Sequence, residues 1–120
     1  MSLWQSVSAV VASCAMFGVA HGDEIANRTD ADLSCLVASL HLMNSAAPEQ
    51  SQAGLASFLY WLGRVDGGAP SLDLETQIAS LSPRFTDAHL NAELVRCGTE
   101  MQTGGAEVQA IGNRLQARGL

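Results

Sequence analysis

Apolar residues recur at intervals of three and four along four stretches of the chain, which is the spacing of one face of an α-helix. No stretch shows sustained alternation with period two, so no strand is expected. The stripes are Leu33, Leu36, Val37 and Leu40; then Leu55, Phe58, Leu59 and Leu62; then Leu74, Ile78 and Leu81; and finally Leu90, Leu94, Cys97, Met101, Gly104, Val108, Ile111 and Leu115. The pattern predicts an all-α fold, a small bundle of about four helices.

Polar residues, proline and glycine predict where these helices begin and end. A loose arm is expected over residues 23–29, followed by a first helix with a cap at Thr29 or Asp30 and an end at Asn44. The second helix should start at Pro48 and end in a turn over residues 63–70 (GRVDGGAP). The third helix should have a cap at Ser71 or Asp73 and a break at Ser82 and Pro83, and the last helix should have a cap at Thr86.

The last stripe keeps its register through Gly104 and Gly105, although two glycines inside a helix cost about 2 kcal/mol relative to alanine. The unbroken register favours one long C-terminal helix over two helices joined at residues 104–105. Tyr60 and Trp61 widen the second stripe, which indicates either a central helix or an exposed aromatic patch.

The N-terminal segment has the features of an export signal. Residues 1–22 contain no charged side chain, and an apolar run ends in Ala20, His21 and Gly22, which suits cleavage before Asp23. We therefore expect a signal peptide over residues 1–22 and a single helical domain over residues 23–120. Cleavage after Ala20, an uncleaved anchor, and lipidation of Cys14 in the sequence VASC are alternatives, and lipidation would place the chain on a membrane.

The charge composition limits which classes of partner are expected. The 120 residues suffice for one domain, and twelve acidic residues against six arginines and no lysine give a net charge of −6. Without clustered cations, neither nucleic acid nor an anionic membrane surface is an expected partner. The absence of lysine suggests a GC-rich bacterial genome, so the expected destination is the periplasm or the medium.

Two cysteines, Cys35 and Cys97, remain after removal of the signal, and both fall on inward faces of different predicted helices. In an oxidising compartment this pattern predicts a disulfide between the first and last helices. The alternative is two buried free thiols that pack as small apolar side chains.

No catalytic motif or metal-ligand spacing is present. His41 and His89 fall on different helices, and Glu93, Glu100 and Glu107 are seven residues apart, as on a solvated helix face. We expect no enzyme activity, no catalytic residues, no metal and no cofactor.

The layout from Cys35 to Cys97 resembles that of small periplasmic acid-stress chaperones of the HdeA type. The matching features are Cys35, the aromatic-glycine run 60–63 (YWLG) with Gly67 and Gly68 after it, and the residues 95–97 (VRC). The resemblance implies a single-disulfide helical domain that protects unfolded clients in acid.

Residues 61–67 (WLGRVDG) are also similar to a stretch of small periplasmic immunity proteins, which bind one fixed protein partner. Two functions therefore compete. In the first, acid below about pH 4 neutralises the carboxylates and loosens the helices, so that apolar residues meet unfolded clients. In the second, Phe58, Tyr60 and Trp61 form a patch for one partner protein.

Overall fold

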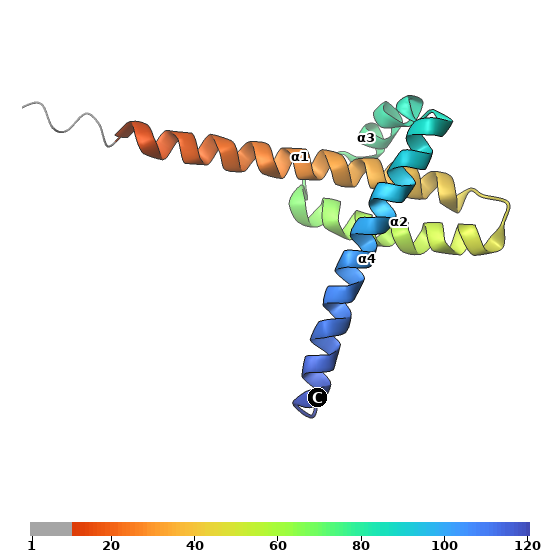
Figure 1. The fold of residues 1–120 in the computed structure, drawn as a ribbon. Coiled ribbons are helices and arrows are strands. Elements are labelled where there is room, and N and C mark those ends of the chain that lie inside the picture. The colour runs from red at the N-terminus through yellow and green to blue at the C-terminus, as the bar shows by residue number, and fades with distance from the viewer. Residues whose placement is uncertain (1–10) are drawn as a thin grey trace, which may run out of the picture.

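The structure is a computed structural model that describes the backbone of residues 11–120 and the side chains of residue 24 and residues 26–120. Its elements are α1 (Val11–Met43), α2 (Pro48–Gly68), α3 (Leu74–Leu81), the 3₁₀ turn η1 (Ser82–Arg84) and α4 (Asp87–Ala117) (Figure 1). The described part of the chain contains no strand. The all-α class, with four helices and a long C-terminal one, is confirmed.

The central helix is α1, because it contacts each of the other three helices. Leu33 and residues 35–39 are almost completely buried, so the helix is covered on most of its circumference over this stretch. The sequence pattern allowed α2 to be the central helix, and the structure assigns that position to α1.

An antiparallel hairpin of α1 and α2 forms the body of the molecule (Figure 1). Gly54 lies where the two backbones come closest, and a Cβ atom there would stand 2.4 Å from the backbone nitrogen of Met43. Only glycine permits this approach. Further along α2, Trp61 and Val65 pack into α1 with at most 1% of their surface exposed.

Several predicted helix ends are confirmed. Ala47 precedes Pro48 at the start of α2. The side chain of Asp73 accepts a hydrogen bond from the backbone N–H of Thr76, and Thr86 accepts one from the N–H of His89. These two side chains cap α3 and α4 in the manner expected of N-cap residues.

Two predicted boundaries are wrong. Residues 23–29 are not a loose arm, because α1 runs without a break from Val11 and passes Thr29 and Asp30. The turn does not begin at Gly63, because α2 continues to Gly68. Burial of Val65 and the ion pair of Arg64 hold this last part of α2 in place, and tertiary packing of this kind outweighs the low helix propensity of glycine.

Helix α4 crosses the hairpin steeply, and its C-terminal half extends away from the body (Figure 1). It is continuous through Gly104 and Gly105, as the register predicted. Because α4 and the start of α1 project, the radius of gyration is 21.1 Å, whereas a compact domain of this length has about 14 Å.

The expected signal peptide lies partly outside the described residues, which begin at residue 11, and the side chain of Cys14 is not among those described. The expected cleavage site before Asp23 falls within α1. None of the described helices combines the length and the apolar character that a membrane span requires.

Candidate functional site: the three-helix junction and the outer face of α2

Cys35 and Cys97 form a disulfide where α4 crosses α1, with 5.6 Å between their Cα atoms. Both residues are buried, at 0% and 3% exposure. The predicted cross-link is confirmed, and the alternative of two free thiols is excluded in this structure. Closing a loop with a sequence separation of 62 residues removes about 4 kcal/mol of unfolded-chain entropy in the chain-entropy model.

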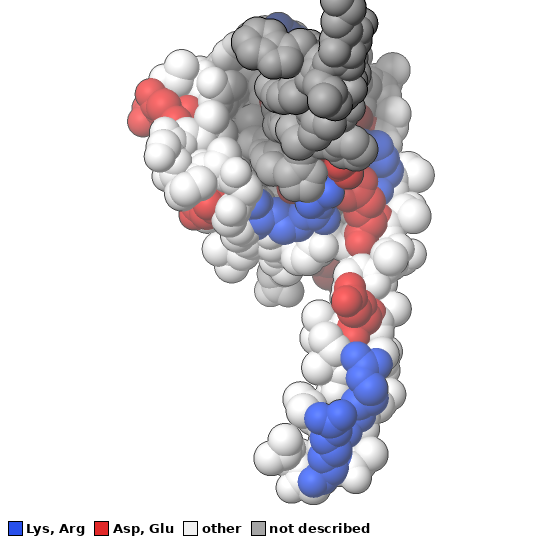
Figure 2. All heavy atoms as spheres, turned by 90° about the vertical axis from the view of Figure 1, so that its left-hand side faces the viewer, with Lys and Arg blue, Asp and Glu red and all other residues white. Residues whose placement is uncertain are grey.

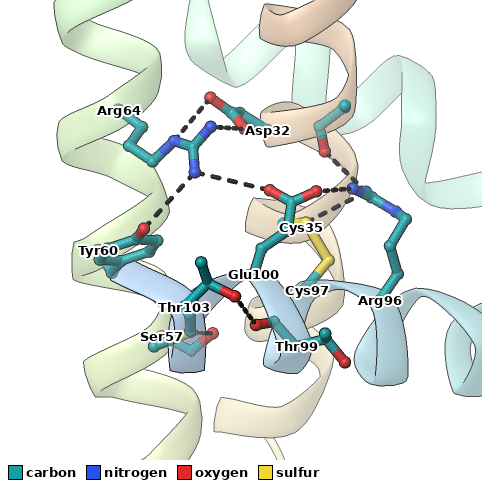
Figure 3. A network of polar contacts seen from close by, with 12 residues as sticks. Asp32, Cys35, Ser57, Tyr60, Arg64, Arg96, Cys97, Thr99, Glu100 and Thr103 are labelled. Atoms are coloured by element: carbon teal, nitrogen blue, oxygen red, sulfur yellow. Dashed lines mark hydrogen bonds and ion pairs between the residues drawn. A yellow bond between two sulfur atoms is a disulfide. The ribbon is translucent and has the colours of Figure 1, made fainter. Parts of the chain in front are cut away.

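An ion pair beside the disulfide joins α1 to α2 (Figure 3). Arg64 donates through Nε to one oxygen of Asp32 at 3.1 Å, and its Nη2 lies 3.1 Å from the other oxygen. The guanidinium carbon also lies 4.9 Å from the ring centre of Trp61. Burial raises the pKa of Asp32, and the nearby charge of Arg64 opposes that shift. Burial disfavours the charged form of the Asp32 carboxyl, and the ion pair with Arg64 offsets part of that desolvation cost.

Glu100 extends this network to α4. One of its oxygens lies 3.6 Å from Nη1 of Arg64, and the other accepts a 3.0 Å hydrogen bond from Arg96. Arg96 also pairs with Glu93 and donates to the carbonyl oxygen of Ala31 at 3.0 Å. Charged hydrogen bonds thus join α1 to α2 and α1 to α4, and an ion pair joins α2 to α4, all around the disulfide.

The junction has the properties of a structural clamp. Among the described side chains, the one cluster with possible metal-ligand spacing consists of Cys35, Glu93 and Cys97. Its two sulfur atoms are bonded to each other and are not thiolates, so the cluster lacks the ligands that a metal would need. An arginine pairs with each carboxylate of the network, and this arrangement is typical of a rigid structural contact more than of a reactive site.

The expected aromatic patch needs correction at Trp61, whose side chain has 0% exposure and belongs to the buried cluster around Cys35 and Cys97. Phe58 and Tyr60 are half-buried and pack against the same cluster. The three aromatic residues therefore do not form one exposed surface.

The exposed apolar residues of α2 are instead Leu55 and Leu59, with 48% and 58% of their surface accessible. They stand one helical turn apart, next to half-buried Phe58. The stripe that the sequence indicated is rotated, because Gly54, Trp61 and Val65 face α1. Because the large indole of Trp61 is buried and Gly54 allows a close approach to α1, Leu55 and Leu59 lie on the outer face of α2.

A ring cluster that the sequence analysis missed connects α1 to the start of α4. Phe85 stacks on His41 with 5.9 Å between ring centres, and it meets His89 edge-on at 4.8 Å. The sequence places the two histidines only on separate helices, and Phe85 has no periodic signal because it lies between η1 and α4.

Comparison with protein-family models, with curated proteins and with solved structures found no match. The fold and the junction define the class: a small all-α protein in which one disulfide and a network of ion pairs hold the last helix across a hairpin. The resemblance to acid-stress chaperones stays a prediction from the sequence.

Proposed function

We propose that the chain is an exported protein-binding module whose contact surface is the outer face of α2. The observation that carries this proposal is the exposure of Leu55 and Leu59 on a helix whose opposite face is the best-packed part of the molecule. Adjacent exposed leucines beside a half-buried phenylalanine are typical of protein contact sites, where a few apolar residues supply most of the binding energy. With Trp61 buried, the two leucines replace it in the proposed surface.

Export is supported by two independent features. The N-terminal sequence resembles a signal peptide, and the two cysteines outside that segment are paired in a disulfide, which persists in oxidising compartments. The intact mass of the exported protein, with and without reductant, tests this part of the proposal. A chain that begins at Asp23 and gains two hydrogens on reduction supports it, whereas an unprocessed or reduced chain contradicts it.

The first form of the function is that of an envelope-stress chaperone. Strong acid neutralises carboxylates in general, which would remove the ion pair between Arg64 of α2 and Glu100 of α4, while the disulfide would keep α4 attached to α1. Such loosening would enlarge the apolar surface next to Leu55 and Leu59. Asp32 does not contribute to this loosening: its pKa is raised in the folded protein, so protonation in acid relieves a cost of folding.

An aggregation assay tests this form of the function. We expect the protein to protect an unfolded client at pH 2–3 when present in equimolar amount, and we expect Leu55→Ser with Leu59→Ser to lose that protection. Val95→Ser is the matched control, because Val95 is a 72% exposed apolar residue on another helix. Absence of protection by the unaltered chain would rule out the chaperone form.

The second form is a module for one fixed partner, as in an immunity protein or an envelope complex. It is favoured by the fact that Leu55 and Leu59 are exposed with the ion pairs of the junction intact, so binding needs no acid. A pull-down from periplasm at neutral pH should then retain one protein with the unaltered chain and with Val95→Ser. Retention by the Leu55→Ser, Leu59→Ser variant as well would exclude the outer face of α2.

A further inference from the structure

We propose that two copies of this chain associate through the distal half of α4, residues 104–117, with the two helices antiparallel. This interface is separate from the outer face of α2 and does not depend on the proposed function. It involves a part of the molecule in which almost every residue is exposed.

The first observation is an apolar stripe with no internal partner. From Gly105 to Leu120 every residue is exposed except Ala110, which is half-buried. Val108, Ile111 and Leu115 continue the spacing of the buried stripe at accessible fractions of 69%, 41% and 40%. A heptad stripe of this kind is the seam along which two helices pack in a coiled coil.

The second observation is charge complementarity along one flank of the stripe. Glu107 and Arg114 are seven residues apart, and each immediately precedes a stripe position. Neither takes part in an ion pair with any described residue. Figure 2 shows acidic side chains followed by basic ones along the projecting part of α4. A helix with this order of charges complements a second copy that runs in the opposite direction.

Pairing two antiparallel copies so that Val108 lies opposite the partner's Ile111 determines the remaining contacts. Leu115 then lies at the level of the partner's Gly104, where the Tyr60 side chain of that copy borders the seam, and Glu107 lies within reach of the partner's Arg114. Twofold symmetry repeats each contact, as in an isologous dimer. Because the body of each protomer is attached at the N-terminal end of α4, the two bodies lie at opposite ends of the paired helices (Figure 1).

The other flank of the stripe explains why a parallel pair is disfavoured. Gly98, Gly105, Gly112 and Gly119 recur every seven residues there, and a Cβ atom at Gly105 or Gly112 would meet nothing within 4 Å. In a parallel pair Glu107 would face this glycine flank, so no charge pair could form. In the antiparallel pair the glycine flanks face each other, which lets the helices approach closely on that side.

Charge reversal tests both the association and its direction, with the disulfide-bonded full chain studied by analytical ultracentrifugation over a range of concentrations. We expect a concentration-dependent dimer. Glu107→Arg and Arg114→Glu should each raise the dissociation constant at least about tenfold, which corresponds to about 1.4 kcal/mol. The variant carrying both changes should return to the behaviour of the unaltered chain, because the two charges have only exchanged places.

Two further variants keep the outcomes distinct. Ile111→Asp should abolish association, whereas Val95→Asp, on the exposed surface of the other half of α4, should leave it unchanged. Circular dichroism checks that each variant keeps its helix content. A monomer at all concentrations would overturn the proposal. A dimer that is sensitive to Ile111→Asp but unaffected by either single charge reversal would overturn the antiparallel arrangement.

Discussion

The two halves of α4 have the same stripe spacing and different surroundings. In the proximal half, residues 87–103, Cys97 is bonded to α1, and Glu100 and Arg96 link α4 to its neighbours. In the distal half, the same spacing carries Val108, Ile111 and Leu115, which lie in solvent. Figure 1 shows the boundary, where α4 leaves the hairpin.

The difference teaches that a heptad pattern predicts a helix and the direction of its apolar face, but does not predict what covers that face. In the proximal half the partner is α1 of the same chain. An isolated helix of the length of the distal half is only marginally stable in water. The distal half is therefore the part of α4 that an external partner would stabilise most. Matched substitutions in the two halves measure this contrast.

The largest expected effect follows from removing the disulfide. Replacing Cys35→Ala and Cys97→Ala together should lower the free energy of unfolding by about 4 kcal/mol, because the unfolded chain regains the entropy of an open loop. Urea unfolding followed by circular dichroism measures it, and reductant added to the unaltered chain should have a similar effect. A loss below about 1 kcal/mol would show that the ion pairs, and not the disulfide, hold the proximal half.

The next effect compares Arg64 of α2, which pairs with Glu100 in the proximal half of α4, with Arg114 in the distal half. Arg64→Ala should cost about 2 kcal/mol because it leaves Asp32 buried without a counter-ion, a value below that of a fully buried pair since a third of the Arg64 side chain is exposed. Arg114→Ala should cost less than about 0.5 kcal/mol in the monomer.

The destabilisation caused by Arg64→Ala should depend on pH. Because burial raises the pKa of Asp32, the neutral carboxyl is the form that tolerates loss of Arg64. The cost of Arg64→Ala should therefore shrink as pH falls through the folded pKa of Asp32, and Asp32→Asn should rescue the variant at neutral pH. A cost that stays constant with pH would show that Arg64 acts through its packing on Trp61 instead.

A smaller effect compares apolar truncations within the one stripe. Leu94→Ala should cost about 1.5 kcal/mol, because Leu94 is half-buried beside the junction. Val108→Ala should change monomer stability by less than about 0.5 kcal/mol. Thermal unfolding of both variants at low protein concentration checks the contrast, and equal costs would mean that the distal half has a partner within its own chain.

The smallest effect comes from the two adjacent glycines. Gly105→Ala should stabilise the helix by up to about 1 kcal/mol, because the new methyl group meets nothing. Gly104→Ala should yield less, since its Cβ would stand 2.8 Å from the hydroxyl oxygen of Tyr60. Equal gains would show that Tyr60 moves aside freely and that the two halves are not separated at Gly104.

Much of the fold could be predicted from short-range chemistry. The side-chain caps at Asp73 and Thr86, the start at Pro48 and the unbroken register through Gly104 each depend on residues close in sequence, and all are confirmed. The disulfide was predictable because two stripes each placed a cysteine inward. The early end assigned to α2 was wrong because contacts with α1, 32 residues away in the case of Arg64 and Asp32, keep that segment helical.

The site was harder to predict than the fold. The choice of which face of α2 is buried depended on how closely Gly54 lets the helices approach, and a stripe of Leu55, Phe58 and Leu59 gives no sign of it. Likewise, Glu100 has the spacing of a solvated face, and its ion pair with Arg64 depends on where α4 crosses the hairpin. Such contacts between distant elements leave no periodic trace in the sequence.

The complete burial of Trp61 in the cluster that contains Cys35 and Cys97 gives the molecule an optical reporter of its own redox state. A disulfide close to an indole quenches its fluorescence by accepting an electron from the excited state. Reduction of the bond should therefore brighten the emission before any change in helix content, so the same chromophore distinguishes opening of the cross-link from unfolding of the body.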